Sequence, residues 1–262
     1  MSAPDGKAGT TDNDTRAEPA WFGDRPVDAA EKPGLVRGVF DSVAGRYDLM
    51  NDLMSGGVHR LWKRAMIDRL APKQGEIFLD VAGGTGDIAF RILERTERAA
   101  HVTVCDLTPA MLEVGRDRAI DRGILTAIDW VTGDAENLPF ENAAMDGCTI
   151  AFGLRNVTHP ERALAEMHRV LKPGGRFLCL EFSHVVLPGL RDLYDVFSRS
   201  MLPTLGAGGA RDRASYEYLV ESIRRFPTQE ALAAMMRDAG FDLVSFRNLS
   251  AGIAALHVGW RT

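Results

Sequence analysis

The chain has 262 residues, of which 45% are hydrophobic and 26% are charged, and its formal net charge is −5. This length supplies one well-formed core and would also permit two small domains. The mild acidity argues against a nucleic-acid binder that depends on phosphate contacts, and no apolar run approaches the length of a membrane-spanning helix.

The first part of the chain, residues 1–33, is predicted to be a flexible tail. It holds Gly, Pro, Asp and Thr with few large apolar side chains, a composition that buries too little surface to fold. Its polar, acidic character is not that of a secretory signal, so we expect a cytoplasmic protein. Residues 34–262 are expected to form a single domain.

Residues 34–74 are predicted to form a helical leader with two apolar stripes. The first stripe, at steps of three and four, consists of Phe40, Val43, Tyr47, Met50 and Met54. The second stripe follows a break at residues 55–57 and consists of Val58, Leu61, Trp62 and Ala65. We expect the second stripe to pack on a sheet. The first is predicted to be a lid that folds over a ligand and excludes water.

Residues 75–183 alternate between apolar runs typical of buried strands and patterns typical of amphipathic helices. Strands are predicted at residues 76–82, 101–107, 128–134, 145–153 and 175–183. Helices are predicted at residues 87–96, 109–123 and 161–171. Strands that alternate with helices predict an α/β fold with a mostly parallel sheet covered on both faces.

Residues 184–240 break this alternation with a helical region, and residues 241–262 close the chain with two strands. The helical patterns fall at residues 190–201, 215–226 and 228–240. The two final apolar runs are separated by a short turn at residues 250–252, which predicts an antiparallel pair at the sheet edge.

The stretch LDVAGGTGDIA (residues 79–89) is a strand–turn–helix junction with three glycines. Such a loop, at the carboxyl end of the first strand, lies where open α/β sheets bind ligands. It also satisfies the loose dinucleotide pattern, so a nicotinamide-dependent oxidoreductase is one alternative. However, Asp80 and Asp87 bracket the loop and would repel a pyrophosphate. They suit S-adenosylmethionine, which has no phosphate and carries an ammonium and a sulfonium.

Further candidate ligand contacts follow the next three strands. Asp106 ends the second strand, where a carboxylate can accept hydrogen bonds from ribose hydroxyls. Asp134, after the third strand, can accept from an adenine amino group, and Ala135 leaves room for the ring. Phe152 and Leu154 lie around the end of the fourth strand and are available to cover the cofactor.

Four stretches together resemble the ubiquinone/menaquinone biosynthesis C-methyltransferases of the UbiE/MenG type. They are YDLMNDLMSGGVHRLW (residues 47–62), AGGTGD (82–87), FGLRNV (152–157) and RVLKPGGRFLCLEFS (169–183). The similarity runs from about Val39 to the C-terminus. The first and last stretches are the most specific, because the fold itself demands neither.

The resemblance implies a class I, Rossmann-like methyltransferase fold with a seven-stranded sheet whose last strand is antiparallel. It implies S-adenosylmethionine as the cofactor. Together with the loop glycines, the predicted cofactor residues are Gly83, Gly84, Thr85, Gly86, Asp106, Leu107, Asp134, Ala135 and Ala151. Relatives often have a serine where this chain has Ala151, so one hydroxyl contact is missing here. The scattered cysteines and histidines have no metal-ligand spacing, and no metal is expected.

The implied reaction is methylation of a ring carbon of a polyprenylated quinol, either a methoxy-benzoquinol or a demethylmenaquinol. We expect Arg155 near the ring oxygen, where its guanidinium can stabilise a phenolate or orient a water that takes the proton. The alternative role for Arg155 is a surface salt bridge. Asn156 is predicted to bind the ring oxygen or the donor's carboxylate, and Tyr47 to face the ligands. His59, Asp48 and His184 are further candidates for the base, each with an equally open structural role.

A catalytically silent donor-binding subunit of a quinone-biosynthesis complex is the second alternative, and the loss of serine at position 151 keeps it open. The expected partner is the quinol, with no nucleic acid; a homodimer and contacts with other quinone-biosynthesis proteins are left open. Residues 190–201 offer an apolar stripe for a prenyl tail. Nearby arginines would touch anionic lipid on the inner face of the membrane: Arg211, Arg213, Arg224 and Arg225.

Overall fold

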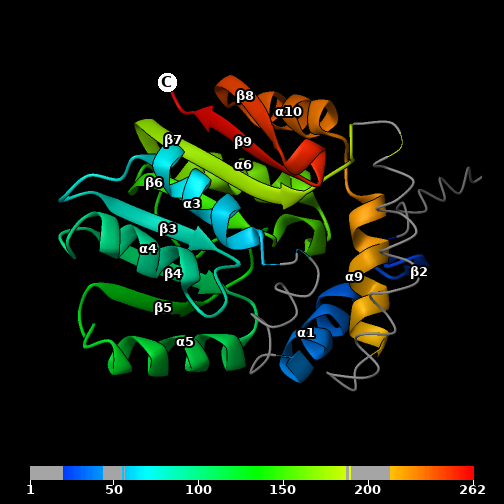
Figure 1. The fold of residues 1–262 in the computed structure, drawn as a ribbon, viewed down its shortest axis with the longest axis horizontal. Helices are drawn as coiled ribbons and strands as arrows, with labels where there is room; N and C mark the ends of the chain where they lie inside the picture. The colour runs from blue at the N-terminus through cyan, green and yellow to red at the C-terminus, as the bar shows by residue number, and fades with distance from the viewer. Residues whose placement is uncertain (1–19, 44–54, 56, 187–188, 190–212) are drawn as a thin grey trace, which may run out of the picture.

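The computed structural model describes residues 20–43, 55, 57–186, 189 and 213–262. Five strands in this part of the chain run parallel: β3 (Ile77–Val81), β4 (His101–Asp106), β5 (Ile128–Thr132), β6 (Met145–Ala151) and β7 (Leu171–Phe182). β8 (Asp242–Leu249) and β9 (Ala254–Trp260) complete a seven-stranded sheet in the order β5-β4-β3-β6-β7-β9-β8 (Figure 1). β9 is antiparallel to both of its neighbours. This confirms the predicted sheet and its antiparallel last strand.

The described helices follow the predicted alternation closely. They are α1 (Lys32–Val43), α3 (His59–Leu70), α4 (Asp87–Arg95), α5 (Pro109–Asp121), α6 (Pro160–Val170), α9 (Arg213–Arg225) and α10 (Gln229–Asp238), with the 3-10 turns η2 (Leu154–Asn156) and η5 (Ser250–Gly252). Local signals set several of the helix starts. Proline opens α5 and α6, where its missing N–H costs nothing. The Thr228 hydroxyl caps α10 by accepting from Ala231 N at 3.3 Å.

The sheet separates two apolar cores, because successive side chains along each strand point to opposite faces. Phe78 packs in a cluster with residues of α3, α4 and α5. Leu79, the next residue, packs in a second cluster with residues of α6 and α10. Both side chains are fully buried, and each burial stabilises the fold by roughly 1.5–3 kcal/mol.

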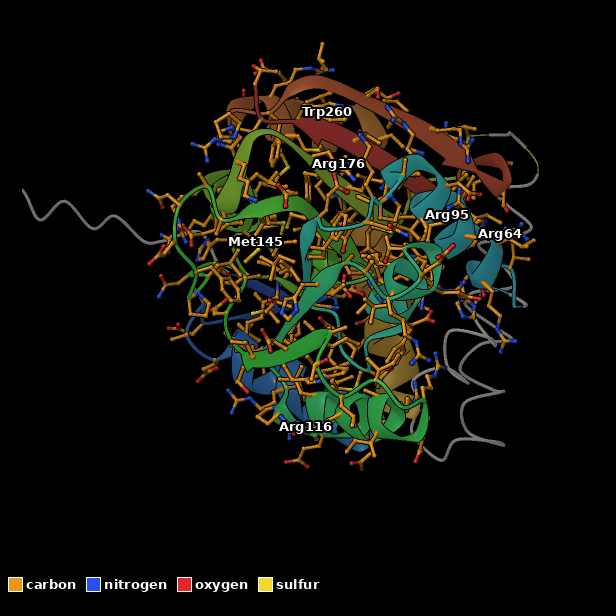
Figure 2. All side chains as sticks on the ribbon, turned by 90° about the vertical axis from the view of Figure 1, so that its left-hand side faces the viewer. Arg64, Arg95, Arg116, Met145, Arg176 and Trp260 are labelled. Atoms are coloured by element: carbon orange, nitrogen blue, oxygen red, sulfur yellow. The ribbon has the colours of Figure 1, made fainter. Side chains whose placement is uncertain are left out.

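The amino ends of the parallel strands are tied together by Arg176 of β7, which Figure 2 labels. Its Nε donates to the carbonyl of Leu70 at 2.6 Å, and its Nη2 donates to Glu76 Oε2 at 2.7 Å. Its guanidinium also lies over the Phe78 ring, 5.5 Å from the centroid. This end of the sheet is therefore closed by packing, which leaves the opposite end for ligands.

The prediction that residues 1–33 form a tail is wrong for residues 20–33. These residues form an antiparallel hairpin, β1 (Ala20–Phe22) and β2 (Arg25–Val27), and the start of α1. The hairpin is held by distant residues of α9: Phe22 stacks on Tyr218 at 4.4 Å, and Arg225 lies 3.6 Å from the Trp21 ring centroid. A prediction from the composition of residues 1–33 cannot include these contacts, because α9 is distant in the sequence.

The leader is confirmed in part. In α3, Trp62 is buried and its Nε1 donates to Ser250 Oγ at 2.9 Å, as expected of a helix packed on the sheet. Leu61 is 64% exposed, so its assignment to the packed stripe is wrong. The helix instead buries Met66, Ile67 and Leu70 beside Trp62. Much of the predicted lid, including Tyr47 and Asp48, lies outside the described residues, as do residues 190–201 and Arg211.

Candidate active site

A pocket lies at the carboxyl ends of β3, β4 and β6, where the loops after these strands face α1 (Figure 1). β3 is the first strand of the sheet in chain order, with β4 on one side and β6 on the other. The order of strands reverses at this point, and ligands of open α/β sheets bind at such a switch. The glycine loop therefore lies where sequence reasoning expects a ligand.

The backbone of the glycine loop is fixed by Asp106. Gly84 N donates to Asp106 Oδ2 at 2.9 Å, and Thr108 N donates to Oδ1 at 2.8 Å. Gly84 has a φ of 54° and Gly86 a φ of 79°, the left-handed region that favours glycine. Burial raises the pKa of the Asp106 carboxyl above its ordinary value, although both backbone hydrogen bonds oppose the rise.

Asp80 is the buried carboxylate beneath the loop. Thr149 Oγ1 donates to its Oδ1 at 2.7 Å, while its Oδ2 has no hydrogen-bond partner among the described residues. Burial raises the pKa of Asp80 to about 7. A Cβ added at Gly83 would lie only 2.7 Å from Oδ2, so a glycine is needed beside this buried oxygen, and Asp80 lines the pocket. An unpaired carboxylate oxygen here fits the ammonium of S-adenosylmethionine.

Asp87, the other predicted acidic residue, is already neutralised within the protein. Lys63 Nζ lies 2.8 Å from its Oδ2, and Arg91 Nε lies 3.1 Å from its Oδ1. Burial acts to raise the pKa of Asp87, but these two cations hold it below its ordinary value. The electrostatic preference for a cationic ligand therefore rests on Asp80 rather than on both residues.

Most of the predicted cofactor residues line the pocket together. These are Gly83, Gly84, Thr85, Asp106, Leu107, Asp134, Ala135 and Ala151. Gly86 is not among the lining residues. It begins α4 and lies against Trp130, whose ring would be 2.6 Å from an added Cβ. Gly86 therefore contributes to the shape of the loop and does not line the pocket.

The predicted catalytic residues separate in the structure. Asn156 lines the pocket, and its Oδ1 accepts from the Tyr218 hydroxyl at 3.0 Å. Arg155 points elsewhere: its Nη1 donates to Glu181 Oε1 and to the carbonyl of Phe152, each at 2.6 Å. This ion pair is buried, so the predicted alternative of a surface salt bridge is wrong. Arg155 Nε and Nη2 have no partner among the described residues.

Sequence reasoning missed most of the wall that α1 contributes. Pro33 and Val36 line the pocket beside Phe40, which belongs to the stripe predicted to be a lid over a ligand. Lys32 anchors the start of this helix, because its Nζ donates to the carbonyl of Val157 at 2.8 Å. The helix begins at Lys32, within the predicted tail, and only the apolar spacing of Val36 and Phe40 signals it.

Two of the other candidate bases, His59 and His184, are bonded elsewhere in the protein, and the third, Asp48, lies outside the described residues. His59 Nδ1 lies 2.9 Å from Ser55 Oγ, and His184 Nε2 lies 2.8 Å from the carbonyl of Phe226. Neither lines the pocket. Within the described residues, no group of His, Cys, Asp and Glu is arranged to hold a metal ion, and no helix is both long and apolar enough to cross a membrane.

Residues 27–261 match the family model described as the ubiE/COQ5 methyltransferase family. The chain belongs to that family. A protein of Brucella anthropi named ubiquinone/menaquinone biosynthesis C-methyltransferase UbiE is 57% identical over 242 residues, which are 92% of this chain and 92% of the relative. A protein of the same name from Paracoccus denitrificans is 58% identical over 240 residues, which are 92% of this chain and 96% of the relative. Membership of a methyltransferase family decides against the oxidoreductase alternative.

Solved structures share the fold of this family member at low sequence identity. A SAM-dependent methyltransferase of Thermotoga maritima has a TM-score of 0.60 and 19% identity, over 87% of this chain and 100% of that one. A Haemonchus contortus phosphoethanolamine N-methyltransferase in complex with S-adenosyl-L-methionine has a TM-score of 0.57 and 16% identity, over 76% of this chain and 52% of that one. The class I methyltransferase fold expected from the sequence is confirmed.

Proposed function

We propose that the protein transfers a methyl group from S-adenosylmethionine to a ring carbon of a polyprenylated quinol in ubiquinone or menaquinone biosynthesis. One observation carries the proposal: the pocket is lined by Asp80, whose buried Oδ2 has no hydrogen-bond partner in the described part of the chain, and by an apolar wall from α1. A cationic donor and a flat apolar ring are the two ligands that such a pocket suits. The names of the relatives from Brucella anthropi and Paracoccus denitrificans support the choice of a quinol.

The donor side of the pocket follows from the strand ends. Asp80 would pair with the ammonium, Asp106 would accept from the ribose hydroxyls, and Asp134 would accept from the adenine amino group. Ala135 and Leu107 would pack against the adenine, with Ala151 contributing a methyl group. The donor, when bound, supplies an electrophilic methyl group on its sulfonium.

The acceptor side is formed by Val36, Phe40 and Phe152, with Asn156 as the polar group among them. These side chains would hold the quinol ring in line with the methyl group, and positioning of this kind contributes much of the rate of a group transfer. Asn156 would hydrogen-bond a ring oxygen. That contact stabilises the negative charge that develops when the ring hydroxyl loses its proton and the carbon becomes nucleophilic.

Arg155 and Tyr47 complete the proposed catalytic set. Two nitrogens of Arg155, Nε and Nη2, have no hydrogen-bond partner among the described residues, and their N–H groups would hold a water that accepts the ring proton. Guanidinium itself stays protonated and does not act as the base. Tyr47 is proposed to face the ring from the leader segment, which lies outside the described residues at that position.

Contact with the membrane surface is part of the proposal, because a quinol with a prenyl tail partitions into lipid. One of the arginines predicted for this contact is paired within the protein, and a second has a buried nitrogen. Arg225 Nε lies 3.1 Å from Asp24 Oδ1, and Arg224 Nη2 is buried without a hydrogen-bond partner among the described residues. The predicted lipid contact of residues 190–201 lies outside the described residues and stays a prediction.

The test is methyl transfer under reducing conditions to short-tailed methoxy-benzoquinol and demethylmenaquinol, with products identified by mass spectrometry. The proposal expects one added methyl group on at least one of the two rings, and no product from the matched variant Asp106→Ala. Tight donor binding by the wild type without any methylated quinol would refute the proposal.

A further inference from the structure

Tyr218 of α9 reaches the pocket through a single hydrogen bond to Asn156. Its hydroxyl lies 3.0 Å from Asn156 Oδ1, and its side chain is buried with 4% exposure. Burial raises the pKa of the Tyr218 hydroxyl, so the group keeps its proton at neutral pH. A protonated hydroxyl donates to the amide oxygen, and this fixes which way the Asn156 amide faces.

The other end of the Asn156 amide is left for a ligand. Its nitrogen has no hydrogen-bond partner among the described residues, although the residue lines the pocket. An amide NH₂ group only donates, so its matching partner is an acceptor oxygen. Without Tyr218 the amide is free to turn over and present its oxygen instead.

The position of Tyr218 is fixed by the N-terminal hairpin. Its ring stacks on Phe22 with centroids 4.4 Å apart and planes 20° apart. The hairpin is held on α9 by polar contacts, since Asp24 N donates to Glu221 Oε2 at 3.0 Å and Arg225 pairs with Asp24. Three segments far apart in sequence therefore meet in the order Phe22, Tyr218, Asn156.

We infer that Tyr218 is a positioning residue, which holds the Asn156 amide so that its NH₂ group is presented to an oxygen of the acceptor ring. This role rests on the proposed methyl transfer to a quinol. A fixed N–H donor at the ring oxygen stabilises the charge that develops there, and it needs no reorientation during the reaction. Tyr218 is therefore expected to affect the reaction of the acceptor and not the binding of the donor.

The variant Tyr218→Phe tests the role, because it keeps the ring on Phe22 and removes only the hydroxyl. We expect kcat/KM for the quinol to fall by about 5- to 20-fold with the donor Kd by calorimetry unchanged, and the urea midpoint to fall only slightly, because a single hydrogen bond is lost. Ser222→Ala is the matched control. Ser222 lies on the same helix, and its hydroxyl donates only to the carbonyl of Leu219 at 2.9 Å, so kinetics should stay at the wild-type level.

A double variant separates positioning from a general structural effect. In an Asn156→Ala background, adding Tyr218→Phe should cause no further loss, because the amide it orients is gone. Losses that multiply in the double variant, an unchanged kcat/KM in Tyr218→Phe, or a weakened donor Kd with intact acceptor kinetics would each overturn the role. A wild type that binds donor but methylates no quinol would refute the proposed function, and this inference with it.

Discussion

Arg155 and Glu181 form an ion pair that is almost completely removed from solvent. Arg155 Nη1 and Glu181 Oε1 are 2.6 Å apart, and the two side chains are 0% and 1% exposed. The carboxylate also accepts from the backbone N of Arg155 and of Phe182. The pair therefore holds the η2 turn, which carries Asn156, against the carboxyl end of β7.

Removing one member of this pair is expected to destabilise the fold strongly. Glu181→Leu leaves a buried guanidinium without its counter-charge, at a cost of about 3–5 kcal/mol in the free energy of unfolding. The double variant Arg155→Met/Glu181→Leu removes both charges and should lose much less than the sum of the single losses. Urea unfolding of the three variants measures this, and additive losses would contradict the assignment.

The same double variant tests whether Arg155 takes part in the reaction. If Arg155 acts on the ring proton, the folded double variant should lose turnover while its donor affinity stays nearly unchanged. The readouts are kcat with the quinol and the donor Kd by calorimetry. Unaltered turnover would reduce Arg155 to a structural role.

Asp80 is expected to make stability depend on pH. Burial raises the pKa of its carboxyl from 3.8 to about 7 in the folded protein, so the folded state binds a proton that the unfolded state releases. The stabilising contribution is complete below the unfolded pKa and is lost as the pH rises through 7. Between pH 5 and 7 the loss is about 1.4 kcal/mol for each pH unit.

Asp80→Asn provides the comparison for this pH effect, because the amide is nearly the same size and does not titrate. Urea unfolding of the donor-free protein between pH 5 and 8 should show a downward slope in the wild type that is reduced in Asp80→Asn. Identical pH profiles for the two proteins would show that Asp80 is ionised throughout.

The hydrogen bond of Lys32 is expected to hold α1 in place as a wall of the pocket. Its buried ammonium donates to the carbonyl of Val157, and burial lowers its pKa while the nearby Glu136 charge opposes that change. Lys32→Met leaves the carbonyl unpaired and loosens the start of the helix, so the donor Kd should rise by about 5- to 10-fold. Arg37→Ala, on the exposed side of the same helix, is the control. Equal donor affinities of both variants and the wild type would contradict the anchoring.

Two glycine-to-alanine changes in helices should act in opposite directions. Beyond its own helix backbone, Gly38 has no atom of the described residues within 4 Å of an added Cβ, so alanine there should stabilise α1 by about 0.5–1 kcal/mol. At Gly115 in α5 the added Cβ would lie 2.3 Å from the Trp130 ring and 3.1 Å from the carbonyl carbon of Thr85.

Steric strain should therefore exceed the gain in helix propensity at Gly115. We expect Gly115→Ala to destabilise the protein by about 1–3 kcal/mol and to weaken donor binding, because Trp130 supports the glycine loop. Thermal unfolding and calorimetry on both variants check the pair. A stabilised Gly115→Ala with normal donor affinity would show that the ring moves freely.

The sheet and the cofactor side of the site could be predicted because their signals are local. Asp106 and Asp134 each follow a predicted strand, and parallel strands bring their carboxyl ends to one edge. The glycine loop is recognisable from its composition, and the resemblance to the family implies that the donor is S-adenosylmethionine. These residues line the pocket as expected.

The acceptor side was predicted less well because it depends on contacts between distant segments. The packing of Phe22 on Tyr218 gives the hairpin its structure, and no local pattern contains it. Arg155 and Asn156 are neighbours in one motif, yet a short turn sends one to a buried carboxylate and the other to the pocket. Periodicity likewise placed Leu61 on the packed face of α3, whereas its side chain is exposed and the helix buries Trp62 and Met66.

The most direct measurement of the central claim is the position of the transferred methyl group. A donor with an isotopically labelled methyl group would be turned over with each short-tailed quinol, and the product examined by nuclear magnetic resonance. The account predicts that the label is bound to a ring carbon, with no label on a ring oxygen. A product labelled only on oxygen would contradict it.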